Sequence, residues 1–114
     1  MPDCIFCRIA AGEIMSPRVY ENGRVFVIND INPVTKVHAL IITKKHIGDV
    51  LSAGDESADL YKDIFDAVRE TARIKGISES GFRLITNCGE DGGQSVPHLH
   101  FHLIGGQKLG VKLV

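Results

Sequence analysis

Hydrophobic and polar positions alternate most strictly in the run His98-Leu99-His100-Phe101-His102-Leu103-Ile104. Side chains of a strand point alternately to the two faces of a sheet. This spacing therefore predicts a strand with its three imidazoles on one face and Leu99, Phe101 and Leu103 on the other. We expect the apolar face to join the core, which leaves the histidines together on the opposite face.

Four further strands are predicted from short apolar runs. Val19–Glu21 and Arg24–Ile28 flank Asn22-Gly23, a dipeptide suited to a two-residue hairpin turn in which both central residues have positive φ. His38–Thr43 is almost continuously apolar, as expected of a central strand buried on both faces. Phe82–Asn87 is the fourth strand, and a glycine-rich loop joins it to the histidine strand.

Two helices are predicted from apolar positions at helical spacing. The longer one spans Asp55–Lys75, and Gly76 is a candidate for its C-cap. Its apolar stripe consists of Leu60, Ile64, Ala67, Val68, Ala72 and Ile74. The shorter one spans residues 3–11, with Asp3 as the expected N-cap and Gly12 as the stop.

These elements predict an α+β domain. Strands joined by short loops usually pair antiparallel, so we expect a meander-like antiparallel sheet of about five strands with the long helix on one face. The chain of 114 residues, 44% of them hydrophobic, fits one domain over residues 1–114 that can bury a core without disulfides.

Charge excludes some classes of partner. The 13 basic and 14 acidic residues are interspersed and give a net charge of -1, so no basic stripe is predicted for a nucleic-acid duplex or an anionic membrane. Lys36, Lys44 and Lys45 are interpreted as solvated surface residues. The sequence shows no apolar stretch typical of a signal peptide or a membrane span, which predicts a cytoplasmic protein.

The three clustered histidines have two chemical interpretations beyond a merely solvated strand face. Alternate histidines can bind a metal, or a neutral imidazole can attack phosphorus while its neighbours align it and donate protons. Gly92 and Gly93, with Ser95 and Asn87, offer hydrogen-bond donors directly before the strand. Donors of this kind suit phosphate oxygens, so the pattern favours anion chemistry.

Three cysteines, an odd number, argue against a closed disulfide framework. Cys4-Ile5-Phe6-Cys7 has the spacing of half a metal site or of a redox pair. Cys88 stands apart and is interpreted as a small apolar filler.

The run His98–Ile104 matches the His-φ-His-φ-His-φ-φ motif, with φ apolar, of the histidine triad (HIT) superfamily. The chain resembles the Hint-like branch of purine nucleotide-binding phosphoramidases through further segments, which are Asp30–Pro33, His38–Ile42, Lys44–Ile47, Asn87, Gly92–Val96 and Gly105-Gly106. The resemblance implies a HIT-like fold and a homodimer that binds purine nucleoside monophosphates. It also implies hydrolysis of nucleoside phosphoramidates through a nucleotidyl-histidine intermediate. The alternative is a non-catalytic nucleotide-binding sensor or adaptor module.

The resemblance also implies catalytic roles for four histidines. His100, the middle member of the triad, is expected to be the nucleophile. His102 would hydrogen-bond the phosphate and assist the leaving amine. His98 would orient the cluster, and His38 would lie beside it.

Substrate contacts carried over from the family form three groups. The phosphate would be held by Asn87, Gly93, Ser95 and the Val96 amide. Asp30 would accept hydrogen bonds from the ribose hydroxyls. The base would lie in an apolar pocket to which the resemblance assigns Ile5, Phe6 and Ile28.

In zinc-bearing relatives a similar cysteine pair joins two histidines, which correspond here to His46 and His98. Cys4, Cys7, His46 and His98 would close a tetrahedral structural zinc site with no open position. The alternative is that the cysteines are partly buried helix residues and His46 a solvated strand end. With zinc bound, His98 belongs to the metal, and His100 and His102 keep the chemistry.

Overall fold

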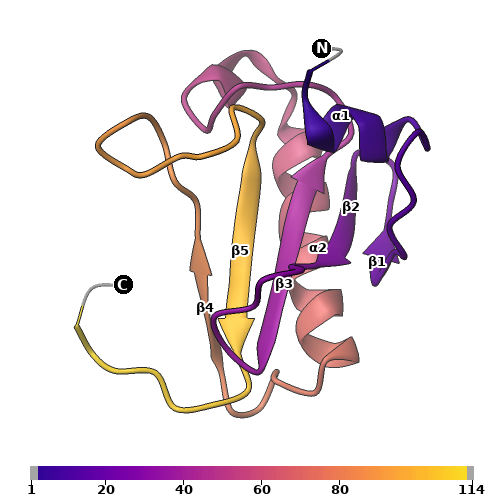
Figure 1. Cartoon of the computed structure of the whole chain (residues 1–114). Helices are drawn as coiled ribbons and strands as arrows, with labels where there is room; N and C mark the ends of the chain where they lie inside the picture. The colour runs from indigo at the N-terminus through magenta and orange to yellow at the C-terminus, as the bar shows by residue number, and fades with distance from the viewer. Residues whose placement is uncertain (1–2, 113–114) are drawn as a thin grey trace.

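The computed structural model describes residues 3–112 and shows an α+β fold with one five-stranded antiparallel sheet (Figure 1). The strands lie in the order β1-β2-β3-β5-β4, and every neighbouring pair is antiparallel. In chain order the elements are α1 (Ile5–Ala10), β1 (Tyr20–Glu21), β2 (Val25–Asn29), β3 (Val37–Thr43), a 3-10 helix η1 (Ser52–Asp55), α2 (Ala58–Ile74), β4 (Phe82–Ile85) and β5 (His100–Gly105). The predicted fold class is confirmed.

The sheet is a simple meander only through its first three strands. After β3 the chain crosses over through α2 to β4 at the far edge, and β5 then returns to lie between β3 and β4. The histidine strand is thus hydrogen-bonded on both sides, to β3 and to β4.

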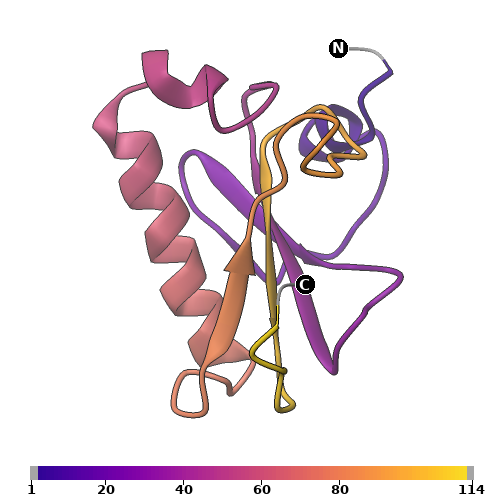
Figure 2. The ribbon, with the colours of Figure 1, turned by 90° about the vertical axis from the view of Figure 1, so that its left-hand side faces the viewer.

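The two helices lie on opposite faces of the sheet (Figure 2). In β2, Val25 and Val27 point into the core beneath α2, whereas Phe26 and Ile28 point toward α1. The histidine strand β5 begins at His100, two residues later than predicted, so His98 and Leu99 lie in the approach to it. Leu99 and Leu103 are buried in the core beneath α2, and Phe101 packs against it. The predicted alternation is confirmed, because the histidines are left on the face that carries α1.

The long helix begins later than predicted. Asp55 belongs to η1, and α2 starts at Ala58 after the N-cap residue Ser57. Ile74 is 45% exposed, so it does not belong to the buried stripe. Gly76 follows the cap with a φ of 72°, in the left-handed region where glycine is favoured, and ends the helix as expected.

The predicted hairpin forms, but its turn is not of the predicted type. Strand pairing continues to a hydrogen bond from the Asn22 amide to the Val25 carbonyl, so Gly23 and Arg24 occupy the centre of the turn. Neither Asn22 nor Gly23 has a positive φ. Instead, the Asn22 side-chain oxygen accepts hydrogen bonds from the amides of Arg24 and Val25.

The N-cap of the short helix is Cys4, not Asp3 as predicted. Cys4 has an extended backbone, and its sulfur accepts a hydrogen bond from the Cys7 amide. A sulfur therefore takes the place that an oxygen usually fills. This cap directs the Cys4 side chain inward, where it is buried.

Candidate active site and metal cluster

Four predicted metal ligands meet where α1, the loop after β3 and the start of the histidine strand converge. The His98 Nδ1 atom lies 3.2 Å from the Cys4 sulfur, 3.5 Å from the Cys7 sulfur and 3.2 Å from the His46 Nδ1 atom. The Cys7 sulfur lies 3.2 Å from the same His46 atom. All four ligand atoms lie within 4.8 Å of one another, whereas Cys88 is outside the group.

These separations fit a single tetrahedral ion. Zinc holds sulfur at about 2.3 Å and nitrogen at about 2.0 Å, so tetrahedral ligands stand about 3.5 Å apart for sulfur and nitrogen and about 3.3 Å apart for two nitrogens. Two sulfurs and two imidazole nitrogens are also the donor set of closed structural zinc sites. The residues present therefore fit the metal that the family resemblance implies.

The ring of His98 is oriented for this role by a backbone group. Its Nε2 atom lies 2.7 Å from the Thr43 carbonyl oxygen, so Nε2–H donates there and Nδ1 keeps its lone pair for the cluster. Burial holds the pKa of His98 below its usual value, which keeps the ring neutral. Burial and the neighbouring Cys4 raise the pKa of Cys7, so a metal ion would have to displace a thiol proton.

His100 is held in the tautomer that a nucleophile needs. Its side chain is 5% exposed, and its Nδ1–H donates to the His98 carbonyl oxygen at 2.6 Å. The Nε2 lone pair is consequently free. The Phe6 ring packs edge-on against His100 with ring centroids 5.0 Å apart.

A chain of hydrogen bonds also assigns the protons of His38 and His102. The Val34 amide donates to His38 Nδ1 at 3.1 Å, so Nε2 of His38 carries the proton. This atom lies 2.9 Å from His102 Nδ1 and donates to it. His102 therefore presents its own Nε2–H as a donor.

Asp30 lies beside this pair. Its Oδ2 atom is 3.4 Å from His38 Nε2, and its Oδ1 atom accepts a hydrogen bond from the Asn32 amide at 2.8 Å. Asp30, His38 and His102 could in distance terms hold a second ion. The proton on His38 Nε2 opposes that, because a ligand nitrogen needs its lone pair.

His102 titrates in a setting that disfavours its charged form. Its pKa lies below the usual value, first because the ring is buried and then because His100 and His38 are close. Asp30 acts in the opposite direction but does not outweigh these effects.

The glycine-rich loop uses several of its polar groups internally. The Asn87 side-chain amide donates to the Gly92 carbonyl at 2.7 Å, and the Gly93 amide donates to the Glu90 carbonyl at 3.0 Å. Ser95 is exposed at the end of the loop. The predicted phosphate contacts of these residues stay predictions.

Gln94 was not assigned a role from the sequence, yet it ties this loop to the rest of the site. Its oxygen accepts from the Gly89 amide, and its NH2 group donates to the carbonyls of Gly48 and Val96 at 2.7 and 3.0 Å. A single glutamine in a polar loop carries no sequence signal of this role.

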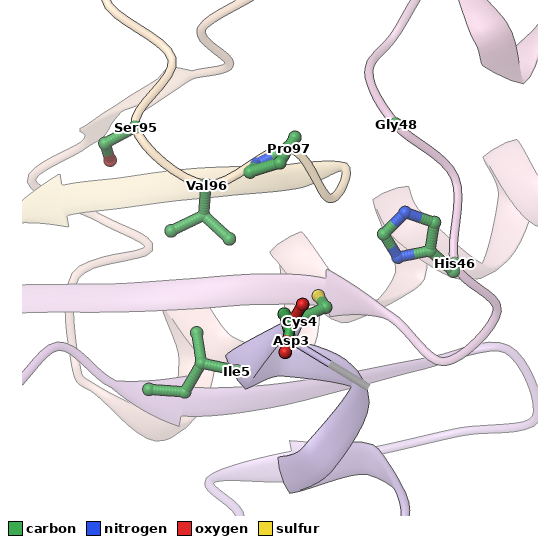
Figure 3. A pocket seen from close by; sticks show the side chains of 8 residues that line it. All are labelled: Asp3, Cys4, Ile5, His46, Gly48, Ser95, Val96 and Pro97. Carbon is green, nitrogen blue, oxygen red and sulfur yellow. The ribbon is translucent and has the colours of Figure 1, made fainter. Parts of the chain in front are cut away.

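Four of the eight predicted substrate residues line two cavities, whereas Asp30, Phe6, Ile28 and Gly93 line neither of them. One cavity of about 500 Å³ lies between α1 and the glycine-rich loop and is lined by Ile5, Ser95 and Val96 (Figure 3). It lies beside the four predicted metal ligands, here called the metal cluster, which are Cys4, Cys7, His46 and His98. The other cavity, here called the catalytic cavity, measures about 560 Å³ and is lined by His38, Asn87 and His102. Phe6 and Ile28 are buried between α1 and the sheet.

Comparison with known proteins places this arrangement in a family. The HIT domain family matches residues 11–109, and the chain belongs to this family. It is similar to a HIT family hydrolase from Clostridium thermocellum, with 46% identity, a TM-score of 0.95 and coverage of 100% of this chain and 99% of the other.

Two further relatives agree with this assignment. A histidine triad protein from Clostridium difficile is 45% identical, with a TM-score of 0.92 and coverage of 99% and 98%. Protein HitA from Neisseria gonorrhoeae is 41% identical over 92% of this chain and 97% of its own length. Within residues 3–112, no helix is long and apolar enough to cross a membrane.

Proposed function

We propose that the protein is a Hint-like hydrolase of purine nucleoside phosphoramidates that works through a nucleotidyl-histidine intermediate. The observation that carries this proposal is the proton arrangement of the histidines. One buried imidazole, His100, has a free Nε2 lone pair, and a second, His102, offers an Nε2–H donor. A binding module would need the donor but not the free nucleophile.

In the first step His100 Nε2 forms a bond to phosphorus, and the bond from phosphorus to the amine nitrogen breaks. The electron pair stays on that nitrogen, and His102 delivers a proton to it. The negative charge of the bound phosphate favours the protonated form of His102 and so offsets its lowered pKa. In that form His102 Nδ1 also carries a proton, and the His38 Nε2–H turns to Asp30 Oδ2, 3.4 Å away, as its acceptor. In the second step water attacks phosphorus, returns a proton to His102 and frees His100.

Substrate binding is assigned to the remaining predicted residues. Asp30 would accept hydrogen bonds from the ribose hydroxyls, and the apolar residues Ile5, Phe6 and Ile28 would hold the purine. Asn87, Gly93, Ser95 and the Val96 amide would face the phosphate, which requires some internal loop hydrogen bonds to be exchanged for bonds to the ligand.

Zinc in the Cys4, Cys7, His46 and His98 cluster would be structural, because four protein ligands leave no open coordination position. The support for this assignment is the match between the ligand separations and a tetrahedron. His98 then contributes to catalysis only through its carbonyl oxygen, which orients His100.

A homodimer is proposed through the β4 edge of the sheet. The helix α2 lies mainly over β1, β2 and β3, which leaves Phe82, Leu84 and Phe101 partly uncovered on the same face. Phe82 is 41% exposed. A second copy would cover these side chains and the free edge of β4. The cytoplasmic location stays a prediction.

Pre-steady-state kinetics with an adenosine phosphoramidate test the proposed activity. We expect a burst of amine release with the wild-type protein and loss of turnover by about a thousandfold or more in His100→Ala, as for loss of an essential nucleophile. Nucleoside monophosphate binding should persist in this variant. If the wild type binds the monophosphate but shows no turnover, the protein is a sensor or adaptor module and not an enzyme.

A further inference from the structure

Two cavities continue from the catalytic cavity along the edge of the sheet where β3 and β4 begin and β5 ends. They measure about 500 and 250 Å³, and both share Gln107 and Lys108 with the catalytic cavity. The Lys36 amide donates to the Gln107 side-chain oxygen at 2.9 Å, which ties the segment after β5 to the loop before β3. Lys108 therefore stands where the catalytic cavity opens into the other two.

The walls of these cavities carry charge of one sign. Lys36, Lys75, Arg83 and Lys108, here called the basic groove, line them. None of the lining residues of the three cavities is an aspartate or a glutamate. Asp30 lies against the His38 ring but does not line the catalytic cavity.

The cations of the basic groove differ from most others in the protein. Among residues 3–112, Lys44 pairs with Glu21, Lys45 pairs with Glu56, and the lysines and arginines along α2 before Lys75 have carboxylate partners. None of the four groove cations has a carboxylate within ion-pair distance among the described residues. With a net charge of -1 overall, this local excess of positive charge is not a general property of the surface.

The position of the groove indicates which part of a substrate would reach it. The apolar residues assigned to the purine, such as Phe6 and Ile28, lie on the side of the histidine strand that carries α1 and β2. The groove begins on the other side of His102, where β4 and the segment after β5 line the catalytic cavity. With the purine on the α1 side, the leaving amine is the part of the substrate that would lie on the β4 side, next to the groove.

We propose that the basic groove is a subsite for a negatively charged leaving group, so that the preferred phosphoramidates carry a carboxylate or a phosphate on their amine. This inference rests on the proposed hydrolase function and adds the class of amine. Lys108 meets the anion nearest the reacting phosphorus, and Lys36 and Lys75 attract longer anionic groups.

Matched substrates isolate the charge of the leaving group. Adenosine phosphoramidates of glycine and of glycinamide are nearly isosteric but differ in charge, and a second pair, phosphoethanolamine and ethanolamine, tests a phosphate in place of a carboxylate. The quantity to measure is the ratio of kcat/KM for the charged over the neutral member. Because the amines differ in basicity, this ratio is compared between wild type and variants, where intrinsic reactivity cancels.

We expect Lys108→Gln to lower the ratio about threefold, the size of an exposed ion pair, and the Lys36→Gln/Lys75→Gln double variant to lower it more for phosphoethanolamine than for glycine. The effect should shrink as salt is added. Lys62→Gln on α2 is the control, because it makes the same change in net charge on an exposed side chain away from the groove. Circular dichroism checks that the variants fold.

The outcomes separate the two proposals. A ratio unchanged in Lys108→Gln and in the double variant, with neutral substrates still turned over, overturns the subsite and leaves the hydrolase standing. If the kcat/KM ratio falls for only one of the two substrate pairs, that pair identifies carboxylate or phosphate as the preferred anion. Absence of wild-type turnover with neutral and charged substrates alike overturns the hydrolase, and the subsite with it.

Discussion

At the scale of single residues, three histidines with identical spacing occupy three different environments. His98 donates its Nε2–H to the Thr43 carbonyl, so its Nδ1 faces two sulfurs. His100 instead donates its Nδ1–H to the His98 carbonyl, which leaves the lone pair on Nε2. His102 accepts a hydrogen bond from His38 at Nδ1. Each backbone or imidazole partner selects one tautomer. Side-chain identity alone therefore does not assign the roles.

The lowered pKa of His102 makes stability depend on pH. In the unfolded chain its pKa is near 6.5 and in the folded protein it is lower, so the unfolded state binds more protons as the pH falls below 6.5. We expect the free energy of unfolding to decrease between about pH 7.5 and about pH 5.5 by more in the wild type than in His102→Gln. Urea denaturation at both pH values measures this. Equal decreases in the two proteins would contradict the prediction.

Gly92 is required by a close approach of the backbone. A Cβ atom there would lie 2.9 Å from the Cys88 amide nitrogen and closer still to its carbonyl oxygen. We expect Gly92→Ala to destabilise the protein by about 2 kcal/mol, because the loop must shift to relieve the overlap. Gly54→Ala is the control, since no atom beyond the adjoining residues lies within 4 Å of its added Cβ among the described residues. Urea denaturation should show little change there, and similar losses in the two variants would refute the argument.

At the scale of elements, the short helix α1 depends on contacts outside itself. Six residues are too few for a helix to be stable alone. Phe6 and Ile9 bury its inner face, and Cys4 serves both as its cap and as a candidate metal ligand. Cap and ligand can be separated by substitution, since serine is a good N-cap but a poor zinc ligand.

We expect Cys4→Ser to remove about one equivalent of zinc per chain and to lower the melting temperature while it keeps the cap. Elemental analysis of untagged protein and thermal denaturation provide the two measurements. Cys88→Ser, outside the cluster, should keep the metal. A wild-type protein purified without metal and with the same melting temperature as Cys4→Ser would exclude the structural zinc.

The long elements could be predicted from the sequence because their apolar patterns reflect burial. The run His38–Thr43 is a central strand, and α2 buries five of the six predicted stripe residues. The turn and the helix cap could not be predicted, because they depend on local hydrogen bonds that leave no hydrophobic pattern in the sequence. Asn22 accepts from the turn backbone without adopting a positive φ, and the Cys4 sulfur replaces Asp3 as the cap.

The site shows the same division. The family resemblance predicted a group of four metal ligands, and the structure brings their ligand atoms within 4.8 Å of one another. They are Cys4, Cys7, His46 and His98. The proton arrangement could not be predicted, because it depends on backbone carbonyls and amides that only the fold brings near. The basic groove was missed because its lysines are far apart in sequence and each alone resembles an ordinary surface residue.

At the scale of the whole molecule, the two ends of the sheet carry different chemistry. The metal cluster lies at the end where β3 finishes, and the basic groove lies at the end where it begins, with the histidine strand running between them (Figure 1). The faces also differ, since α2 covers one and leaves its β4 side partly open.

The uncovered β4 side predicts how the oligomer responds to substitution. We expect Leu84→Glu to shift the protein from dimer to monomer, because it places a charge among apolar side chains that a second copy would bury. Analytical ultracentrifugation over a dilution series measures the equilibrium. Leu51→Glu is the control, at an apolar residue that is 80% exposed near η1. A wild-type monomer at all concentrations would disprove the dimer.

The insertion of β5 between two earlier strands has a consequence for the newly made chain. As the polypeptide leaves the ribosome, β3 and β4 are both available before their common partner, so each presents an unpaired edge. Cys4, Cys7 and His46 also emerge well ahead of His98. The nascent chain therefore holds three of the four candidate ligands but neither His98 nor the proposed nucleophile His100, and one late segment completes the sheet and both groups of residues together.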